Sequence, residues 1–172
     1  MENLTLVEPR DDLKTAFQEM ALEYRAAGEY YAHHVTAMND FTGFMAGIRN
    51  LRKGVNLLPN LVPMTTYWLL KDDQFILGES RLRHRLTPAL QNEGGHIGYA
   101  IRPGQRRKGY GTCVLDLTLE KARDMGLSRV LVTCDTDNLP SARIIEKNGG
   151  ALSGYGISPS SGAQVSQYWI DL

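Results

Sequence analysis

The chain has 172 residues, a usual length for one domain with a full hydrophobic core, and we expect a single domain over residues 1–172. Lysine and arginine together number 19, as do aspartate and glutamate, so the composition provides no bulk attraction to nucleic acid or to an acidic membrane surface. No apolar run is long enough to span a membrane, and the N-terminal residues lack a secretion signal core. We therefore expect a cytoplasmic protein.

The N-terminal half reads as one strand, two helices and a β-hairpin. Residues 4–7 form a short β-type run, stopped by a proline. Asp11 and Asp12 can cap a helix, and Asn39 or Asp40 can cap a second one that ends at Gly54. Two β-type runs follow, residues 65–70 and 75–86, joined by a polar turn. The expected apolar stripes of the helices are Leu13, Phe17, Met20 and Tyr24, then Phe41, Phe44, Ile48 and Leu51.

The C-terminal half alternates strands with helices. A buried strand over residues 96–101 is followed by a helix over 114–125, in which apolar residues recur at helical spacing. A strand over 129–134 and a short helix beginning near Asn138 come next, and two closing strands follow from residue 151. This order predicts an α/β (α+β) domain with a mixed, mostly antiparallel, twisted sheet and helices on both faces.

The two cysteines predict neither a disulfide nor a metal centre. Cys113 lies in the apolar helix that begins at the turn over residues 105–112, and Cys134 ends an apolar strand, so we expect both to be buried thiols. Two cysteines without a cluster of histidines beside them do not make a metal-binding pattern. We therefore expect no metal.

The chain is organised around residues 105–112, which connect a strand to the start of a helix. Such a turn gathers unpaired peptide N–H groups and the positive end of the helix dipole at one point. Gly109 and Gly111 carry no side chain, so a phosphate can approach the main chain there, and we expect a branched side chain at Gly111 to block it. A solvated basic turn is the alternative. A Walker loop fits worse because Lys108 precedes Gly109, and a dinucleotide fingerprint fits worse because Val114 stands where its third glycine would be.

Two motifs in this half resemble those of one known family. Arg106, Gly109 and Gly111 match an Arg/Gln-x-x-Gly-x-Gly/Ala signature that is similar to the acetyl-coenzyme A loop of the GNAT superfamily of N-acetyltransferases. Further along, Asn138, Ser141 and residues 146–149 resemble the family's Asn-x-x-Ala/Ser…Glu-Lys-x-Gly helix. The predicted order of strands and helices is also the order expected of the GNAT fold. The resemblance implies a single-domain, acetyl-coenzyme A-dependent N-acetyltransferase.

The resemblance also implies where acetyl-coenzyme A binds. The strand ending at Ile101 should splay away from the strand over 130–134, so that pantetheine can bind the freed backbone groups of Tyr99 and Ile101. Asn138 and Ser141 should lie beside the pantetheine or the diphosphate. The loop residues implied to bind the diphosphate are Arg106, Arg107, Lys108, Gly109, Tyr110, Gly111 and Thr112.

The implied reaction is direct attack of an amine on the thioester, which requires a base because an alkyl ammonium has a pKa near 10. His96, at the start of the splayed strand, is the favoured candidate. Glu79 is the alternative, although flanking arginines should depress its pKa. Where the family often carries a catalytic tyrosine, seven residues after Asn138, this chain has Ile145. The acid role is therefore vacant, or is filled by Tyr155, Tyr168 or water.

The acceptor site is expected between the first helices and the loop that follows them. Its walls would come from Tyr30, Tyr31, His33, His34 and residues 55–63, which suit a primary amine of a small molecule or of a peptide. The chain would act as a monomer or a homodimer. Two rival functions remain open, a non-catalytic acyl-coenzyme A sensor and an unrelated binder of nucleotide phosphates.

Overall fold

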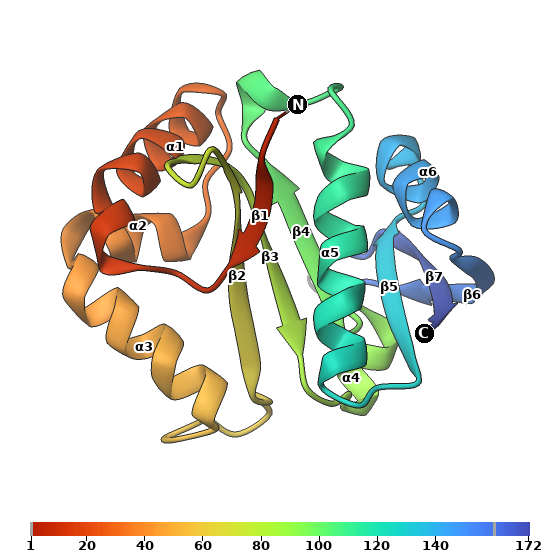
Figure 1. Cartoon of the computed structure of the whole chain (residues 1–172). Helices are drawn as coiled ribbons and strands as arrows, with labels where there is room; N and C mark the ends of the chain where they lie inside the picture. The colour runs from red at the N-terminus through yellow and green to blue at the C-terminus, as the bar shows by residue number, and fades with distance from the viewer. Residues whose placement is uncertain (1, 160) are drawn as a thin grey trace.

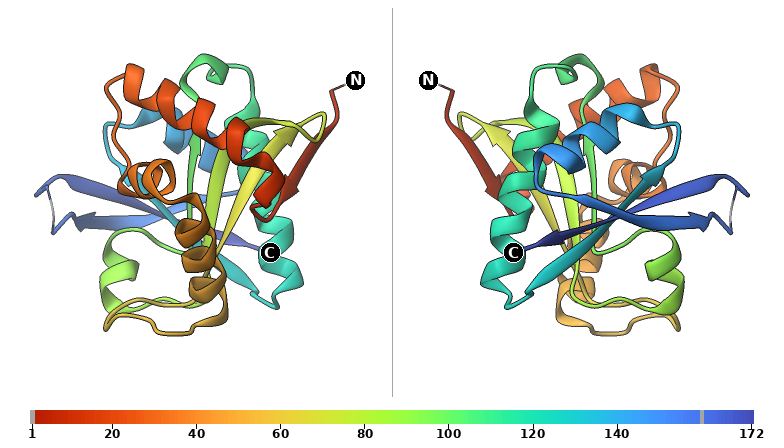
Figure 2. Two further views of the ribbon diagram at one scale, coloured as in Figure 1. Left: turned by 90° about the vertical axis from the view of Figure 1, so that its left-hand side faces the viewer. Right: turned by 90° about the vertical axis from the view of Figure 1, so that its right-hand side faces the viewer.

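The computed structural model describes residues 2–159 and 161–172. Helices α1, α2 and α3 cover one face of a central sheet, and α5 and α6 cover the other (Figure 1 and Figure 2). The helices are α1 (Lys14–Ala26), α2 (Ala32–Asn39), α3 (Phe41–Lys53), α4 (Pro88–Asn92), α5 (Tyr110–Asp124) and α6 (Leu139–Lys147). The strands are β1 (Leu4–Val7), β2 (Met64–Lys71), β3 (Phe75–Arg83), β4 (Ile97–Ile101), β5 (Arg129–Asp135), β6 (Ala151–Ile157) and β7 (Gln164–Asp171).

The described strands form a seven-stranded sheet in the order β1-β2-β3-β4-β5-β7-β6. Neighbouring strands are antiparallel, except that β4 and β5 run parallel and connect through α5. The predicted fold class is thereby confirmed. β4 and β5 are paired at Ile97 and Val132, whereas β5 and β7 are paired over the whole of β5. The two parallel strands therefore diverge beyond Ile97, as the predicted splay requires.

The predicted cap of the first helix is wrong, because Asp11 and Asp12 lie in a 3₁₀ turn and α1 begins after it, at Lys14, without a side-chain cap. Asp40 caps α3, because its Oδ1 accepts a hydrogen bond of 2.9 Å from the Gly43 N–H, and Gly54 closes the same helix in a left-handed conformation. α2 and α4 were not predicted. α2 has eight residues, of which His34 and Ala37 are buried, so it lacks a repeating apolar stripe. No described helix combines the length and the apolar character that crossing a membrane requires.

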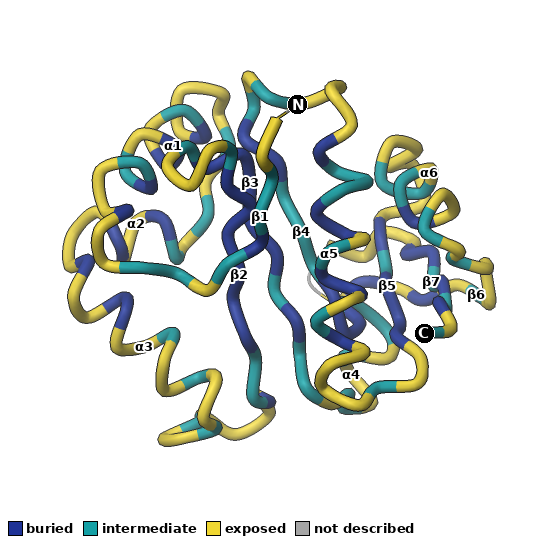
Figure 3. The backbone as a smooth tube through the Cα atoms, viewed as in Figure 1, coloured by how far each residue is buried: buried dark blue, intermediate teal, exposed yellow. Residues whose placement is uncertain are grey.

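Each face of the sheet has its own hydrophobic core, and the central strands are the most deeply buried (Figure 3). Under α1–α3, Trp68 stacks on Phe17 with ring centroids 5.0 Å apart. Under α5, Ser80 Oγ lies 2.7 Å from Thr118 Oγ1, among buried aliphatic residues. A bulge shifts the register of β2 and β3 where Leu69 faces Gly78 and Leu70 faces Ile76. Beyond it Glu79 is opposite Trp68, on the face that α1–α3 cover.

Candidate active site

The loop from β4 to α5 presents a row of free peptide N–H groups. Among the described residues, those of residues 107–111 have no hydrogen-bond partner, whereas those of Thr112 and Cys113 donate to Gly109 O at 3.1 and 3.2 Å. Arg107 and Gly109 have φ angles of 62° and 89°, which turn the chain sharply into the helix. The free N–H groups and the positive end of the α5 dipole together favour an anion at this point.

The two glycines of this loop have different surroundings. A Cβ added at Gly109 would meet no atom within 4 Å, so the N–H groups beside it are open. A Cβ added at Gly111 would lie 2.6 Å from Cδ1 of Ile144, on α6. Gly109 therefore leaves room for a ligand, while Gly111 lets α5 and α6 approach each other closely.

Gly111→Ala should destabilise the fold by about 1–3 kcal/mol, the usual cost of overpacking a tight contact. The double variant Gly111→Ala, Ile144→Val removes the Cδ1 methyl group that the new Cβ meets, and it should recover most of the loss. Urea unfolding of the two variants, monitored by circular dichroism, measures both effects. A fully stable Gly111→Ala variant that has lost affinity for coenzyme A would contradict this packing role and favour phosphate clearance.

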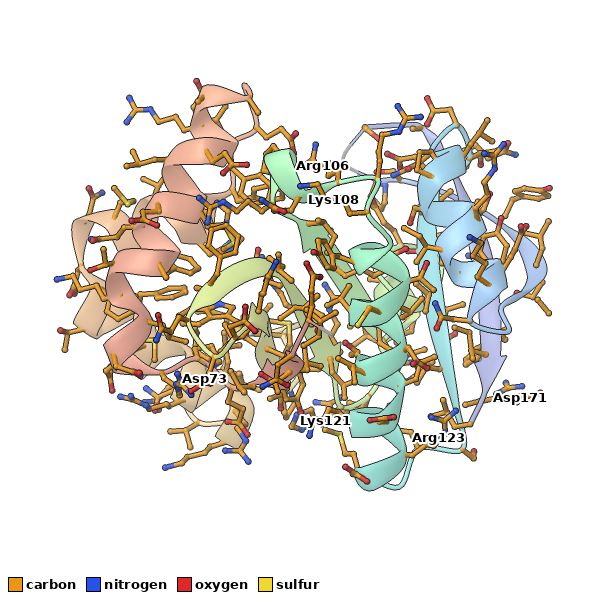
Figure 4. The ribbon with its side chains drawn as sticks, turned by 45° about the horizontal axis from the view of Figure 1, so that its top comes forward. Asp73, Arg106, Lys108, Lys121, Arg123 and Asp171 are labelled. Carbon is orange, nitrogen blue, oxygen red and sulfur yellow. The ribbon has the colours of Figure 1, made fainter. Side chains whose placement is uncertain are left out.

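The basic side chains of the loop do not all face the free N–H groups. Arg106 donates from its Nη1 and Nη2 to the Glu29 carboxylate at 2.6 and 2.8 Å, and from its Nε to Ile101 O at 2.9 Å. Lys108, beside it on the same loop (Figure 4), donates from its Nζ to Gln105 Oε1 at 3.0 Å. Arg107 is exposed. Arg106 therefore ties the loop to the connection between α1 and α2, which the motif alone did not indicate.

Tyr110 and Thr112 complete the loop. The Tyr110 hydroxyl donates to Glu2 Oε2 at 2.7 Å, so this side chain packs toward the N-terminal strand while its peptide N–H remains free. Thr112 is half-buried in the first turn of α5. Tyr110 can therefore contribute its backbone to an anion site.

A cavity of about 300 Å³ lies where β4 and β5 diverge. The Tyr99 hydroxyl lies 2.8 Å from Ser141 Oγ, and this contact connects β4 to α6. Asn138 caps α6, because its Oδ1 accepts a hydrogen bond of 3.1 Å from the Ser141 N–H. Ile101 is buried in the core, so it can serve a ligand through its backbone. The residues that line the cavity are Arg83, Glu93, Gly94, Ile97, Gly98, Tyr99, Thr133, Cys134, Asp135, Asn138, Ser141 and Val165.

Glu79 lies in a buried cluster with two histidines and an arginine. Its Oε1 is 2.7 Å from His33 Nε2, 3.5 Å from His34 Nε2 and 3.3 Å from Arg81 Nη2. Burial alone would raise the pKa of Glu79, but the imidazoles of His33 and His34 and the charge of Arg81 outweigh it and hold that pKa far below its usual range. Burial lowers the pKa of His33, although Glu79 acts in the opposite direction. At neutral pH the cluster thus holds a carboxylate beside a neutral imidazole.

This cluster was missed from the sequence as a unit. His33 and His34 were assigned only to the wall of the acceptor site, and Glu79 was considered without them. The partners are 46 residues apart, and the helix that presents the histidines lacks an apolar stripe. The one signal of this cluster in the sequence is the adjacent pair His33 and His34, shortly before the helix that Asp40 caps.

His96 fastens β4 to β5. Its peptide N–H donates to Leu131 O at 2.7 Å, and its ring Nδ1 accepts from the Leu131 N–H at 2.9 Å. The Nδ1 lone pair is therefore occupied, which leaves the proton on Nε2 of the neutral ring. Burial, and then the nearby charge of Arg83, lowers the pKa of His96. This geometry favours a structural role, because the neutral ring has no free lone pair with which to take a proton.

Tyr168 lies on β7 in the larger core, opposite Val132. Burial raises the pKa of its hydroxyl, so it remains protonated at neutral pH. Ile145, at the position where a catalytic tyrosine was considered, is fully buried in the same core. The surroundings of both residues are those of packing residues.

Three comparisons with known proteins bear on this arrangement. A family model described as acetyltransferase (GNAT) domain matches residues 3–151. The uncharacterized N-acetyltransferase YnaD of Bacillus subtilis (strain 168) is 33% identical over 60 residues, which span 34% of this chain and 35% of that protein. The match thus covers about a third of the length of this curated relative.

The solved structures share the fold at low sequence identity. RimL, a ribosomal L7/L12 alpha-N-protein acetyltransferase in complex with coenzyme A, has a TM-score of 0.72 at 16% identity, covering 98% of this chain and 94% of that one. RimJ of Mycobacterium smegmatis, in complex with a coenzyme A disulfide, has the same TM-score and identity and covers 98% and 81%. YncA of Salmonella typhimurium, a putative acetyltransferase with acetyl-coenzyme A, has a TM-score of 0.65 at 14% identity and covers 98% and 94%.

Proposed function

The chain belongs to the GNAT family of acetyl-coenzyme A-dependent N-acetyltransferases, and on that premise we propose that it transfers the acetyl group directly to a primary amine of a small molecule or of a peptide. The observation that carries the proposal is the row of peptide N–H groups over residues 107–111, which have no partner within the described part of the chain and lie beside the gap between β4 and β5. The N–H groups would bind the diphosphate of acetyl-coenzyme A, and the adjoining gap would hold its pantetheine arm with the thioester.

The loop and the gap suit the two halves of acetyl-coenzyme A. The N–H groups of residues 107–111 would hold the diphosphate, with Arg107, Lys108 and Thr112 around it. The Arg102 N–H bonds to Leu77 O on β3, so by the alternation of a strand the backbone groups of Tyr99 and Ile101 point to the opposite edge, toward the gap. Those groups would bind the pantetheine amides, with Asn138 and Ser141 beyond them. When bound, acetyl-coenzyme A supplies the acetyl group as a thioester.

The acceptor would approach from the side of α1 and α2. His33, His34 and Tyr31 lie there together, with ring centroids of His33 and His34 4.2 Å apart and of Tyr31 and His34 5.1 Å apart. Glu79 and Arg81 of β3 add fixed charges on the same side. Aromatic faces beside a carboxylate suit the ammonium group of an acceptor.

Two assays test this function. Calorimetric titration should show binding of acetyl-coenzyme A and of free coenzyme A that is much tighter than binding of ATP, because only the first two carry pantetheine. Release of coenzyme A thiol should then depend on an added primary amine, drawn from a panel of small amines and of peptides with free N-termini. Tight binding without thiol release for every amine would instead identify a non-catalytic acyl-coenzyme A sensor.

Asn138→Ala should lower both stability and affinity for acetyl-coenzyme A. Loss of the cap costs about 1 kcal/mol of stability, and the amide that borders the cavity is lost with it. Asp40→Ala, which uncaps α3 on the opposite face of the sheet, is the matched control. It should lose comparable stability in urea unfolding and keep its affinity in calorimetry. If Asn138→Ala behaves like this control, Asn138 is a helix cap alone.

A further inference from the structure

The cluster around Glu79 lies next to the cavity rather than apart from it. In the register of β3 and β4, Glu79 is opposite Ala100 and Arg81 is opposite Gly98. Facing residues of paired strands lie about 4.5–5.5 Å apart at Cα and point to the same face of the sheet. Gly98 borders the cavity, and a Cβ added to it would meet no atom within 4 Å. Open space therefore adjoins the cluster on the face that α1 and α2 cover.

We propose that His33 is the general base of the acetyl transfer and that Glu79 positions its ring. This inference rests on the proposed function and adds the residue that takes the proton. Glu79 acts through His33, because its Oε1 lies 2.7 Å from His33 Nε2 and its side chain is only 3% exposed. The side chain of His33 is 22% exposed, so it can meet an acceptor that Glu79 cannot reach.

The contacts of His33 determine which of its nitrogens can act. An ionised carboxylate only accepts hydrogen bonds, so Nε2 carries the proton that it donates to Glu79, and Nδ1 holds the lone pair. Arg81 Nη2 lies 2.9 Å from both ring nitrogens, a position over the face of the ring and not on the in-plane lone pair of Nδ1. A substrate ammonium is an N–H donor that can approach this lone pair, in the field of Glu79.

The step balances with the two substrates alone. His33 Nδ1 takes one proton from the ammonium, and the amine nitrogen forms a bond to the acetyl carbonyl carbon. The carbon–sulfur bond breaks, and its electron pair leaves with sulfur as the thiolate. The second proton lost by nitrogen goes to solvent, and the imidazolium proton goes to the thiolate or to solvent. Glu79 stabilises the imidazolium in the interval, as a carboxylate partner of a catalytic histidine does.

The groups that face His33 support a proton-transfer role over a metal site. Ligand atoms of His33, His34 and Glu79 lie within 4.8 Å of one another, which suits a cation by distance. The guanidinium of Arg81, however, places a permanent positive charge against the same ring and carboxylate. The other facing groups are His34 on α2, Tyr31 before it, Tyr24 on α1, which contacts His34, and the apolar ring of Phe44 on α3.

A scan of the histidines tests the base directly. His33→Gln, which can still donate to Glu79, should lower kcat/KM for the amine by about 10²-fold or more, the usual effect of losing a general base. Its affinity for coenzyme A should be unchanged. The matched control is His84→Gln, because His84 follows the end of β3, contacts Thr65 of β2 and is not among the residues that line the cavity; it should keep wild-type kinetics.

The pH profile separates a base from a structural residue. Because the pKa of His33 lies below the ordinary histidine value, kcat/KM should rise with pH along a limb below about pH 6.5. This limb should disappear in His33→Gln. Since the Glu79 carboxylate raises the pKa of His33, Glu79→Gln should lower kcat/KM by about 10-fold and move the limb to lower pH. A ¹⁵N spectrum of the imidazoles should show the Nε2-protonated form of His33, with a lower pKa in Glu79→Gln and no change at His84.

Four results would contradict these proposals. If wild-type protein releases thiol on addition of an amine and His33→Gln keeps the acidic limb, His33 is not the base. If His96→Gln removes the limb instead, the base is His96, as the sequence indicated. If EDTA abolishes activity and Zn²⁺ restores it, the cluster is a metal site and the proposal is overturned. If wild-type protein binds coenzyme A and no amine elicits thiol release, the proposed function itself fails.

Discussion

Gly109→Val should reduce the affinity for acetyl-coenzyme A by 100-fold or more and abolish turnover at ordinary cofactor concentrations. Gly109 precedes α5 with a φ of 89°, and the space around its missing Cβ is open. A β-branched residue resists this conformation, at a cost of about 1–2 kcal/mol. Its methyl groups would also occupy the approach to the free N–H groups of residues 107–111. Calorimetry with acetyl-coenzyme A measures the loss.

Gly126→Val provides the matched control for this prediction. Gly126 follows α5 at its other end, with a φ of 85° and no atom within 4 Å of an added Cβ. The two variants should therefore lose similar stability in urea unfolding, while only Gly109→Val loses cofactor affinity. Equal affinity in both would refute the assignment of the diphosphate to this loop.

Gly98→Val should lower kcat/KM for acetyl transfer by about 100-fold or more without unfolding the protein. Gly98 lies in β4, borders the cavity and has open space where a side chain would point. Valine favours strand conformation and reduces the flexibility of the unfolded chain, so stability should stay equal or rise slightly. The new side chain would fill the space between the cofactor channel and the Glu79 cluster. Steady-state kinetics and thermal unfolding of one preparation measure both effects.

A valine in another strand controls for the change of residue type. Gly154 lies in β6, where an added Cβ would make an ordinary contact of 3.4 Å with Gln167 Oε1. Gly154→Val should keep wild-type kinetics. A Gly98→Val variant that is equally active would show that the reacting groups do not meet beside β4.

The sequence predicted the elements that have local signals. Apolar spacing located the helix that became α5 and the stripe of α1, since Phe17, Met20 and Tyr24 are all buried. The capping residues Asp40 and Asn138 marked the starts of α3 and α6. The splay of β4 from β5 was expected from the family resemblance and is confirmed. Each of these follows from neighbours in the chain or from a motif.

The remaining features depend on contacts between distant residues. Arg106 was expected to raise the positive potential of the loop, yet it is paired with Glu29, 77 residues away. Gly111 was expected to clear space for a phosphate, and Ile144 of another helix is its neighbour. The bulge in β2 and β3 sets the face to which Glu79 points, and no pattern within one strand encodes it. Partners of this kind are determined by packing and not by local spacing.

The ion pair of Arg106 and Glu29 joins the two halves of the site. Glu29 follows α1 and precedes the histidines of α2, while Arg106 lies in the loop from β4 to α5. The guanidinium of Arg106 also lies over the ring of Tyr24 on α1, with its carbon 5.7 Å from the ring centroid. The loop that would hold the cofactor and the segment that would face the acceptor are thus fixed to one another.

The most direct measurement of the central claim is a titration of ¹⁵N-labelled protein with coenzyme A, followed through the peptide N–H resonances. The largest shifts should fall on residues 107–111, whose N–H groups have no partner in the described structure, and on Tyr99 and Ile101 in β4. They should saturate with the dissociation constant found by calorimetry. Unchanged resonances at residues 107–111 in a saturated complex, with shifts confined to the surface between α1 and α2, would contradict the claim that this loop holds the cofactor.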